Sequence, residues 1–78
     1  MSAAPDDLME REELEKGVLS FMSTLPPQQR LVFDLRFYQH LQFEEISHIT
    51  GRAVGTAKTL YREAIAKLRV YAIKEGWR

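Results

Sequence analysis

The sequence contains no cysteine among its 78 residues, so neither a disulfide framework nor a thiolate metal site is available. No apolar run approaches the roughly 18 residues of a membrane span, and the first residues lack the apolar core of a signal peptide. We therefore expect a protein that has no membrane partner and stays in the cytoplasm, a compartment with which the missing cysteines are compatible.

The chain also lacks a net charge, which argues against the strongly basic profile of many free-standing DNA-binding proteins. The two ends of the chain nevertheless differ. Residues 1–20 hold six acids against two bases, whereas residues 21–78 hold nine bases against five acids. The positive field therefore belongs to the C-terminal part.

Signatures of catalysis and of cofactor binding are missing too. Gly55 and Thr56 lack the glycine-rich context of a phosphate loop, and no nucleophile elbow or dinucleotide pattern occurs. His40 and His48 are eight residues apart without a third ligand at a recognisable spacing, so ordinary histidines are favoured over a metal site. Adjacent acids such as Glu44 and Glu45 point about 100° apart on a helix, which suits caps or surface positions better than acid catalysis. We expect no enzyme, no cofactor and no metal.

The chain shows no strand alternation and no internal repeat, and its apolar residues recur at helical spacing. This pattern predicts an all-α domain of four helices, over residues 6–78, after a disordered N-terminus over residues 1–5. The first helix is capped by Asp6 or Asp7 and ends near Leu25. The other three are expected to end near Tyr38, to span Phe43–Thr50, and to run from Val54 to about Lys74, before Gly76.

Apolar stripes indicate which side of each early helix faces the core. Two prolines separate these helices, and Ser23 or Thr24 is expected to cap the second one. Trp77 is expected to pack back on the first helix, although a role for a partner is the alternative. The first stripe is Leu14, Val18, Phe21, Met22 and Leu25; the second is Leu31, Val32, Leu35 and Tyr38, with Phe33 and Phe37 on its flank.

The segment from Leu41 to Leu68 has the layout of a helix-turn-helix without a wing. Gly51 suits the left-handed position that ends a helix, so that the chain can turn sharply into the next one. The seam formed by Phe43, Ile46, Ile49, Val54, Ala57, Tyr61, Ala64, Leu68 and Tyr71 must face the protein. The opposite face carries Lys58, Thr59, Arg62 and Arg69, which favours nucleic-acid binding, with a solvated helix surface as the alternative.

Several motifs together resemble region 4 of bacterial RNA polymerase sigma factors, particularly the extracytoplasmic-function group. The resemblance covers about Leu25 to Arg69. It rests on the order and spacing of Leu25-Pro26-Pro27, Leu35-Arg36-Phe37-Tyr38, Phe43-Glu44-Glu45-Ile46, Gly51 and Val54-Gly55-Thr56-Ala57-Lys58-Thr59.

The resemblance implies a domain that docks on the β-subunit flap of RNA polymerase and places its last helix in the major groove of the promoter −35 element. Carried over position by position, Lys58, Thr59 and Arg62 are the implied helix contacts. Arg52, Thr56 and the backbone near Gly55 are the implied phosphate contacts. Among these, Lys58 and Thr59 are expected to read bases.

Some positions depart from the family pattern. Ala53 stands where serine often caps the recognition helix, and Thr50 and Arg52 stand where aliphatic residues are usual. Leu60 and Glu63 occupy positions that are frequently basic, so weak DNA affinity is expected of the domain alone.

These departures, with the zero net charge, favour an alternative: an interaction module bound mainly by an anti-sigma factor or a polymerase subunit. The chain also lacks the promoter-melting region 2 of sigma factors. It is therefore expected to be an excised C-terminal domain or a free-standing regulator.

Overall fold

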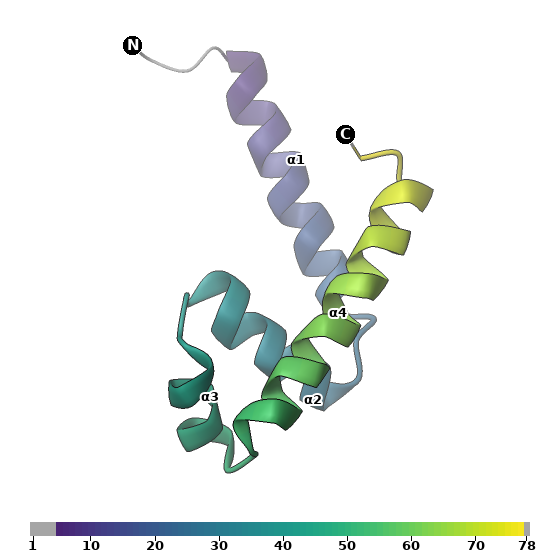
Figure 1. Ribbon diagram of the computed structural model, residues 1–78. Coiled ribbons are helices and arrows are strands. Elements are labelled where there is room, and N and C mark those ends of the chain that lie inside the picture. The colour runs from purple at the N-terminus through teal and green to yellow at the C-terminus, as the bar shows by residue number, and fades with distance from the viewer. Residues whose placement is uncertain (1–4, 78) are drawn as a thin grey trace.

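The computed structural model describes the backbone of residues 5–77 and the side chains of residues 11–77. Its elements in order are α1 (Pro5–Met22), α2 (Pro27–Phe33), the π-helical segment η1 (Asp34–Tyr38), α3 (Phe43–Thr50) and α4 (Val54–Lys74). The described residues contain no strand, so the predicted all-α fold with a wingless helix-turn-helix is confirmed (Figure 1). The disorder expected for residues 1–5 falls mainly on residues 1–4, which lie outside the described part, and α1 is described from Pro5 onward.

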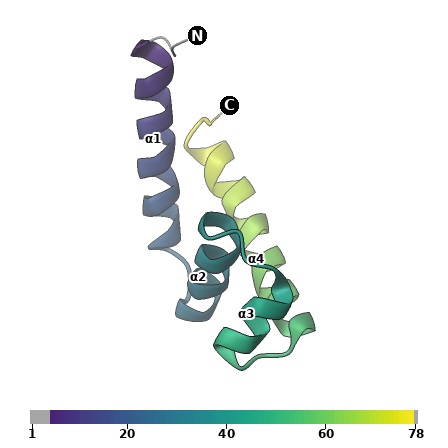
Figure 2. The same cartoon turned by 90° about the vertical axis from the view of Figure 1, so that its left-hand side faces the viewer.

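The helix-turn-helix lies at one end of the molecule, and the start of α1 lies at the other. Both views show α3 and the first turns of α4 far from the beginning of α1 (Figures 1 and 2). The last turns of α4 run back toward α1. None of the described helices is long and apolar enough to cross a membrane.

Hydrogen bonds at the junction between α1 and α2 show that the predicted cap of α2 is wrong. Ser23 and Thr24 do not cap α2: the Ser23 hydroxyl donates to the carbonyl of Ser20, and the Thr24 hydroxyl donates to the carbonyl of Phe21. Both bonds belong to the end of α1. The N-cap of α2 is Pro26, which has no side-chain hydrogen bond. A hydroxyl close to the last carbonyls of a preceding helix finds acceptors there first.

Arg30 of α2 supplies the remaining donors at this junction. Its Nε donates to the carbonyl of Met22 at 3.1 Å, and its Nη2 donates to the carbonyl of Leu25 at 2.9 Å. Carbonyls at the end of a helix lack partners within that helix, so this guanidinium satisfies part of the C-terminal end of α1. The same two bonds hold α2 against α1.

Two apolar clusters form the core, and α4 contributes to both. Partly buried side chains such as Tyr61 pack against both clusters. The first cluster contains Val18, Phe21, Leu25, Phe33 and Ala64, and the second contains Val32, Leu35, Ile46 and Ala57.

The buried side of α2 is rotated from the predicted one. Phe33, expected on the flank, is fully buried, whereas Leu31 and Tyr38 are 47% and 38% exposed. The reason is that Phe33 packs edge-on against Phe21 of α1, with ring centroids 5.6 Å apart, and stacks against Tyr61 of α4 at 6.2 Å. A helix that is apolar around most of its circumference does not disclose on which sides its neighbours lie.

Two more exposed residues correct the predicted stripes. Leu14 is 52% exposed on α1, and Ile49 is 58% exposed on α3. Val18 and Ile46, the neighbouring members of the same stripes, are buried as predicted.

The helix formed by α2 and η1 reaches Tyr38 as predicted, but its last part has wider turns. The amide of Gln39 donates to the carbonyl of Asp34 at 3.2 Å, five residues back, and the amide of Leu41 donates to the carbonyl of Leu35 at 3.1 Å. His40 follows in a left-handed conformation with φ of 57°. The π-helical turn therefore ends the helix and directs the chain toward α3.

Candidate nucleic-acid interface

The turn between α3 and α4 is built around Gly51. This residue has φ of 73°, and its amide donates to the carbonyl of Ser47 at 2.9 Å. A Cβ at Gly51 would meet nothing within 4 Å, so the backbone conformation rather than space requires glycine here. The predicted left-handed end of the first helix is confirmed.

Two hydroxyl groups that were not predicted to take part fix this turn through hydrogen bonds. Ser47 donates its hydroxyl to the carbonyl of Arg52, while Thr50 donates to the carbonyl of Ile46 at 2.8 Å. The Thr50 oxygen also accepts from the amide of Arg52 at 3.3 Å. Serine and threonine beside a helix-ending glycine are a recognisable signal for such local bonds. Thr50, which stands where the family usually has an aliphatic residue, therefore stabilises the turn through hydrogen bonds.

The start of α3 is stabilised by a side chain that could have suggested acid catalysis. Glu45 accepts a hydrogen bond from the amide of Gln42 at 3.0 Å, while Glu44 is exposed. An acid in the first turn also suits the positive end of the helix. The interpretation of this pair as cap and surface residues is confirmed.

The start of α4 has no side-chain cap. Ala53 occupies the N-cap position with an extended backbone and no side-chain hydrogen bond. The helix is instead held by its apolar side, where Ala57 and Ala64 are both fully buried. This burial fixes the rotation of α4 and turns the opposite side outward.

The six predicted DNA contacts lie together at the beginning of this helix and in the turn before it. Arg52 is half-buried in the turn. The Thr59 hydroxyl donates to the carbonyl of Gly55 at 3.0 Å, which leaves it acceptor capacity toward a ligand. The exposed members of the group are Gly55, Thr56, Lys58, Thr59 and Arg62.

Two residues of α4 that depart from the family pattern face different ways. Leu60 is half-buried and packs against the second apolar cluster, so it lies toward the core and not on the outer face. Glu63 is exposed one turn after Thr59. Only the acid therefore changes the charge of the outward surface.

The ring of Phe43, predicted as part of the apolar seam, contacts two cations. Lys58 Nζ lies 5.9 Å from the centroid of the Phe43 ring, and Arg36 Cζ lies 5.0 Å from it. Arg36 Nη1 also donates to the carbonyl of Leu41 at 3.0 Å. The sequence signal for this group of three side chains is an aromatic residue at the start of α3, with basic residues on the elements before and after α3.

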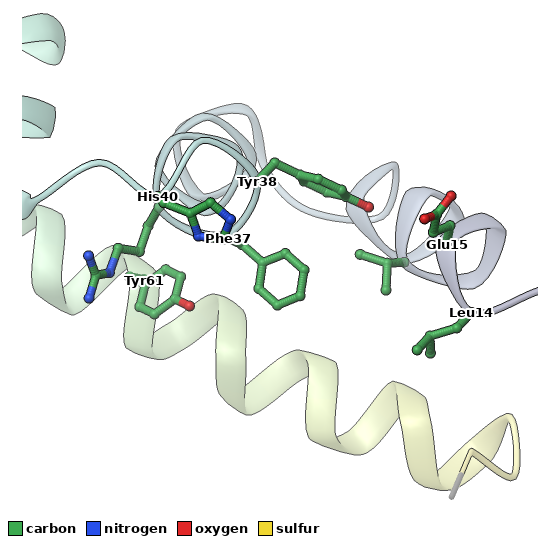
Figure 3. Close-up of a pocket in the computed structure, with 8 residues that line it drawn as sticks. Leu14, Glu15, Phe37, Tyr38, His40 and Tyr61 are labelled. Atoms are coloured by element: carbon green, nitrogen blue, oxygen red, sulfur yellow. The ribbon is translucent and has the colours of Figure 1, made fainter. Parts of the chain in front are cut away.

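An open apolar groove of about 600 Å³ lies elsewhere, between α1, η1 and α4 (Figure 3). The side chains of Leu14, Phe37 and Tyr61 line it, and the Tyr38 hydroxyl points toward the part of α1 that carries Glu15. Burial, and then the negative charges of Glu15 and Asp34, raise the pKa of the Tyr38 phenol above 10.0. The complete lining is Leu14, Glu15, Val18, Arg36, Phe37, Tyr38, His40 and Tyr61.

The described residues offer no cluster of three histidine, aspartate or glutamate side chains that could hold a metal ion. His40 lines the groove, and His48 is exposed on α3.

Comparisons with known proteins point to one family. Residues 21–70 match the family described as sigma-70, region 4. The RNA polymerase sigma factor SigV of Bacillus subtilis is 35% identical over 54 residues, which cover 69% of this chain and 32% of that protein. The RNA polymerase sigma-E factor of Streptomyces coelicolor is 31% identical over 64 residues, or 82% of this chain and 36% of that protein. The chain thus spans about a third of the length of these curated relatives.

Proposed function

The chain belongs to the sigma-70 region 4 family, and from this we propose that it is the promoter-recognition domain of a sigma factor of the extracytoplasmic-function group. In this role, α4 enters the major groove of the −35 element and the domain helps to direct transcription initiation in the cytoplasm. The role is one of binding and not of catalysis. We propose residues 6–78 as the unit that carries it.

One observation supports the proposal more than any other: the helix-turn-helix presents polar side chains outward while α4 is held by its buried alanines. Thr59 and Arg62 are exposed, and both point about 140° to 160° away from fully buried Ala57. A helix presented in this way can place its first turns against base edges.

The proposed contacts divide by chemistry. Lys58, Thr59 and Arg62 contact the DNA from the helix, whereas Arg52, Thr56 and the backbone of Gly55 contact phosphates. Phosphate contacts fix the register of a protein on the duplex, and base contacts supply its sequence preference. Glu63 on the same surface repels the phosphates, so the affinity of the isolated domain is weak. Because its few bases neutralise few phosphates, the slope of log affinity against log salt is shallow.

The test is a fluorescence-anisotropy titration of labelled −35-type and scrambled duplexes at low and moderate salt. We expect Lys58→Ala and Arg62→Ala to weaken binding while circular dichroism shows an unchanged fold. Lys74→Ala is the matched control, because its exposed side chain lies about 24 Å beyond Lys58 and about 18 Å beyond Arg62 along α4. Unchanged affinity in both test variants would contradict the proposal.

The groove in Figure 3 supports the protein partners that we propose alongside DNA. Leu14, Phe37 and Tyr38 are 52%, 38% and 38% exposed there, which leaves apolar surface for a partner. Tyr61 lines this groove and points about 160° away from Thr59 around α4, so the part of the groove at Tyr61 faces away from Thr59. We propose that the flap of the polymerase β subunit docks here while DNA is bound.

The alternative is a domain whose main partner is an anti-sigma factor or a polymerase subunit, with little DNA affinity of its own. Binding assays with purified β-flap fragment distinguish the two arrangements. Phe37→Ala should weaken flap binding and leave DNA binding unchanged. A chain that binds the flap but shows no preference between the two duplexes would favour the alternative.

A further inference from the structure

Two elements, α4 and η1, bring side chains to a single ring at the start of α3. Lys58 of α4 and Arg36 of η1 both lie over Phe43, with the cationic groups 5.9 Å and 5.0 Å from its centroid. These distances are those of cation–π contacts, in which the negative face of the ring attracts a positive charge.

The ring is itself held in place from the core outward. Phe43 packs edge-on against Tyr61, with centroids 5.8 Å apart and ring planes at 68°. Tyr61 in turn stacks on Phe33, which is fully buried. Arg36 adds a tether, because the same guanidinium that covers Phe43 donates to the carbonyl of Leu41. Phe43 is therefore a fixed platform beside the first turns of α4.

Lys58 does not point in the same direction as the other predicted contacts. It is one residue after buried Ala57 and so leaves α4 about 100° from the core direction. Thr59 and Arg62 leave the helix about 160° and 140° from that direction, nearly straight outward. The contact with Phe43 draws the Lys58 ammonium further toward α3 and away from the outermost line of the helix.

We infer that Phe43 is a positioning residue that holds the Lys58 ammonium at the edge of the interface, for a phosphate of the DNA backbone and not for a base. This inference rests on the proposed DNA-binding function and changes the expected division of labour within it. Lys58 contributes affinity without sequence preference, and Thr59 and Arg62 read the bases. A lysine ammonium is a point charge that suits such a phosphate contact.

The first experiment measures Lys58→Ala against both duplexes over a range of salt concentrations, with the whole 78-residue chain. The affinities for the −35-type and scrambled duplexes should fall by the same factor, so that their ratio stays constant. The slope of log affinity against log salt should become shallower by about one phosphate contact. Arg62→Ala should instead lower the ratio.

The second experiment tests Phe43 itself through a double-mutant cycle. Phe43→Leu should weaken binding by about two- to five-fold, because a lysine that the ring no longer orders in advance loses more side-chain entropy when it binds the phosphate. In the Lys58→Ala background, the same substitution should have no further effect. Phe37→Leu is the control, because Phe37 stacks on Phe33 with centroids 4.9 Å apart and does not contact Lys58.

The outcomes separate this inference from the function on which it rests. A lower ratio in Lys58→Ala, with normal preference in the unmodified chain, overturns the inference and leaves the DNA-binding function intact. An equal loss from Phe43→Leu with and without Lys58 shows a structural role only, and also overturns it. Failure of the unmodified chain to bind either duplex overturns both.

Discussion

The indole of Trp77 lies so close to Gly17 that a Cβ at this glycine would be 2.5 Å from Cζ2 of Trp77. The ring also packs edge-on against Tyr71, with centroids 5.6 Å apart. Trp77 follows Gly76, whose φ of 71° turns the chain back after α4. The predicted packing of Trp77 on the first helix is therefore confirmed, and it requires a residue without a side chain in the middle of α1.

Gly17→Ala should destabilise the domain by about 1–2 kcal/mol, although alanine is the better helix former. The added methyl group forces the indole away from α1, and overpacking of this kind outweighs the helix propensity that is gained. Urea unfolding followed by Trp77 fluorescence measures both the stability and the displacement of the ring.

The control removes the indole ring of Trp77, so that a methyl group at position 17 no longer meets it. In a Trp77→Ala background, Gly17→Ala should stabilise the domain by up to about 1 kcal/mol, because only the helix propensity remains. Urea unfolding of this pair is followed by circular dichroism, since Trp77 is the only tryptophan of the sequence. A destabilising effect of similar size in both backgrounds would show that another neighbour of Gly17 excludes the methyl group.

Gly51→Ala should cost about 1–2 kcal/mol of unfolding free energy through backbone strain alone. The position has φ of 73°, and a Cβ there has no atom within 4 Å, so no clash contributes. Gly55→Ala is the matched control: it also has open space, but its φ is not in the left-handed region, and the substitution should not destabilise. Equal effects of the two substitutions in thermal unfolding would contradict a conformational cause.

His40→Gly should stabilise the domain by about 0.5 kcal/mol. His40 has φ of 57°, a conformation that disfavours residues bearing a Cβ, whereas glycine adopts it freely. The gain is partial because glycine also gives the unfolded chain more freedom. A stability loss in urea unfolding would mean that the imidazole makes contacts in the groove worth more than the strain.

Local signals in the sequence explain why α3 and α4 were predicted with their observed bounds. Gly51 is required by the left-handed conformation that ends α3, and the spacing of the alanines of α4 shows which side of this helix is buried. The rotation of α2 could not be predicted, since Phe33 is buried only because α1 and α4 both reach it. Such contacts depend on residues distant in sequence.

The same distinction between local signals and contacts distant in sequence applies to the candidate site. Periodicity around α4 places Thr59 and Arg62 outward, and the structure agrees. It gives no information on the direction of a flexible lysine, so the approach of Lys58 to Phe43 became visible only when α3 and α4 were placed against each other. The π-helical turn of η1 was not predictable either, because five residues with helical spacing fit an α-helix equally well.

Glu15→Gln should lower the pKa of Tyr38 toward its ordinary value. Burial raises this pKa above 10.0, and the carboxylates of Glu15 and Asp34 raise it further. Because the pKa of Tyr38 is higher in the folded state than in the unfolded state, ionisation of this phenol leaves the free energy of unfolding unchanged well below pH 10. That free energy falls as the pH rises through the folded-state pKa. The difference in absorbance titration between the chain and its Tyr38→Phe variant isolates this phenol.

The Tyr38 experiment also tests whether α1 keeps its place in solution. Glu12→Gln removes a different exposed acid of α1 and should leave the Tyr38 titration unchanged. If Glu15→Gln had no effect either, α1 would not lie against η1 in solution, and the groove would be open on that side.

Glu63→Gln should raise the affinity for both the −35-type and the scrambled duplex by about two- to five-fold at low salt. The exposed carboxylate lies one turn after Thr59, where it repels nearby phosphates without regard to sequence. Glu75→Gln is the control, because this acid lies about 18 Å further along the chain direction of α4, beyond the Debye length of about 10 Å at 0.1 M salt. Weaker binding and a lower preference for the −35-type duplex would instead identify Glu63 as a reader, since a glutamate can accept a hydrogen bond from the amino group of cytosine. The departure from a basic residue at this position would then set the promoter preference of the domain, and not its weakness.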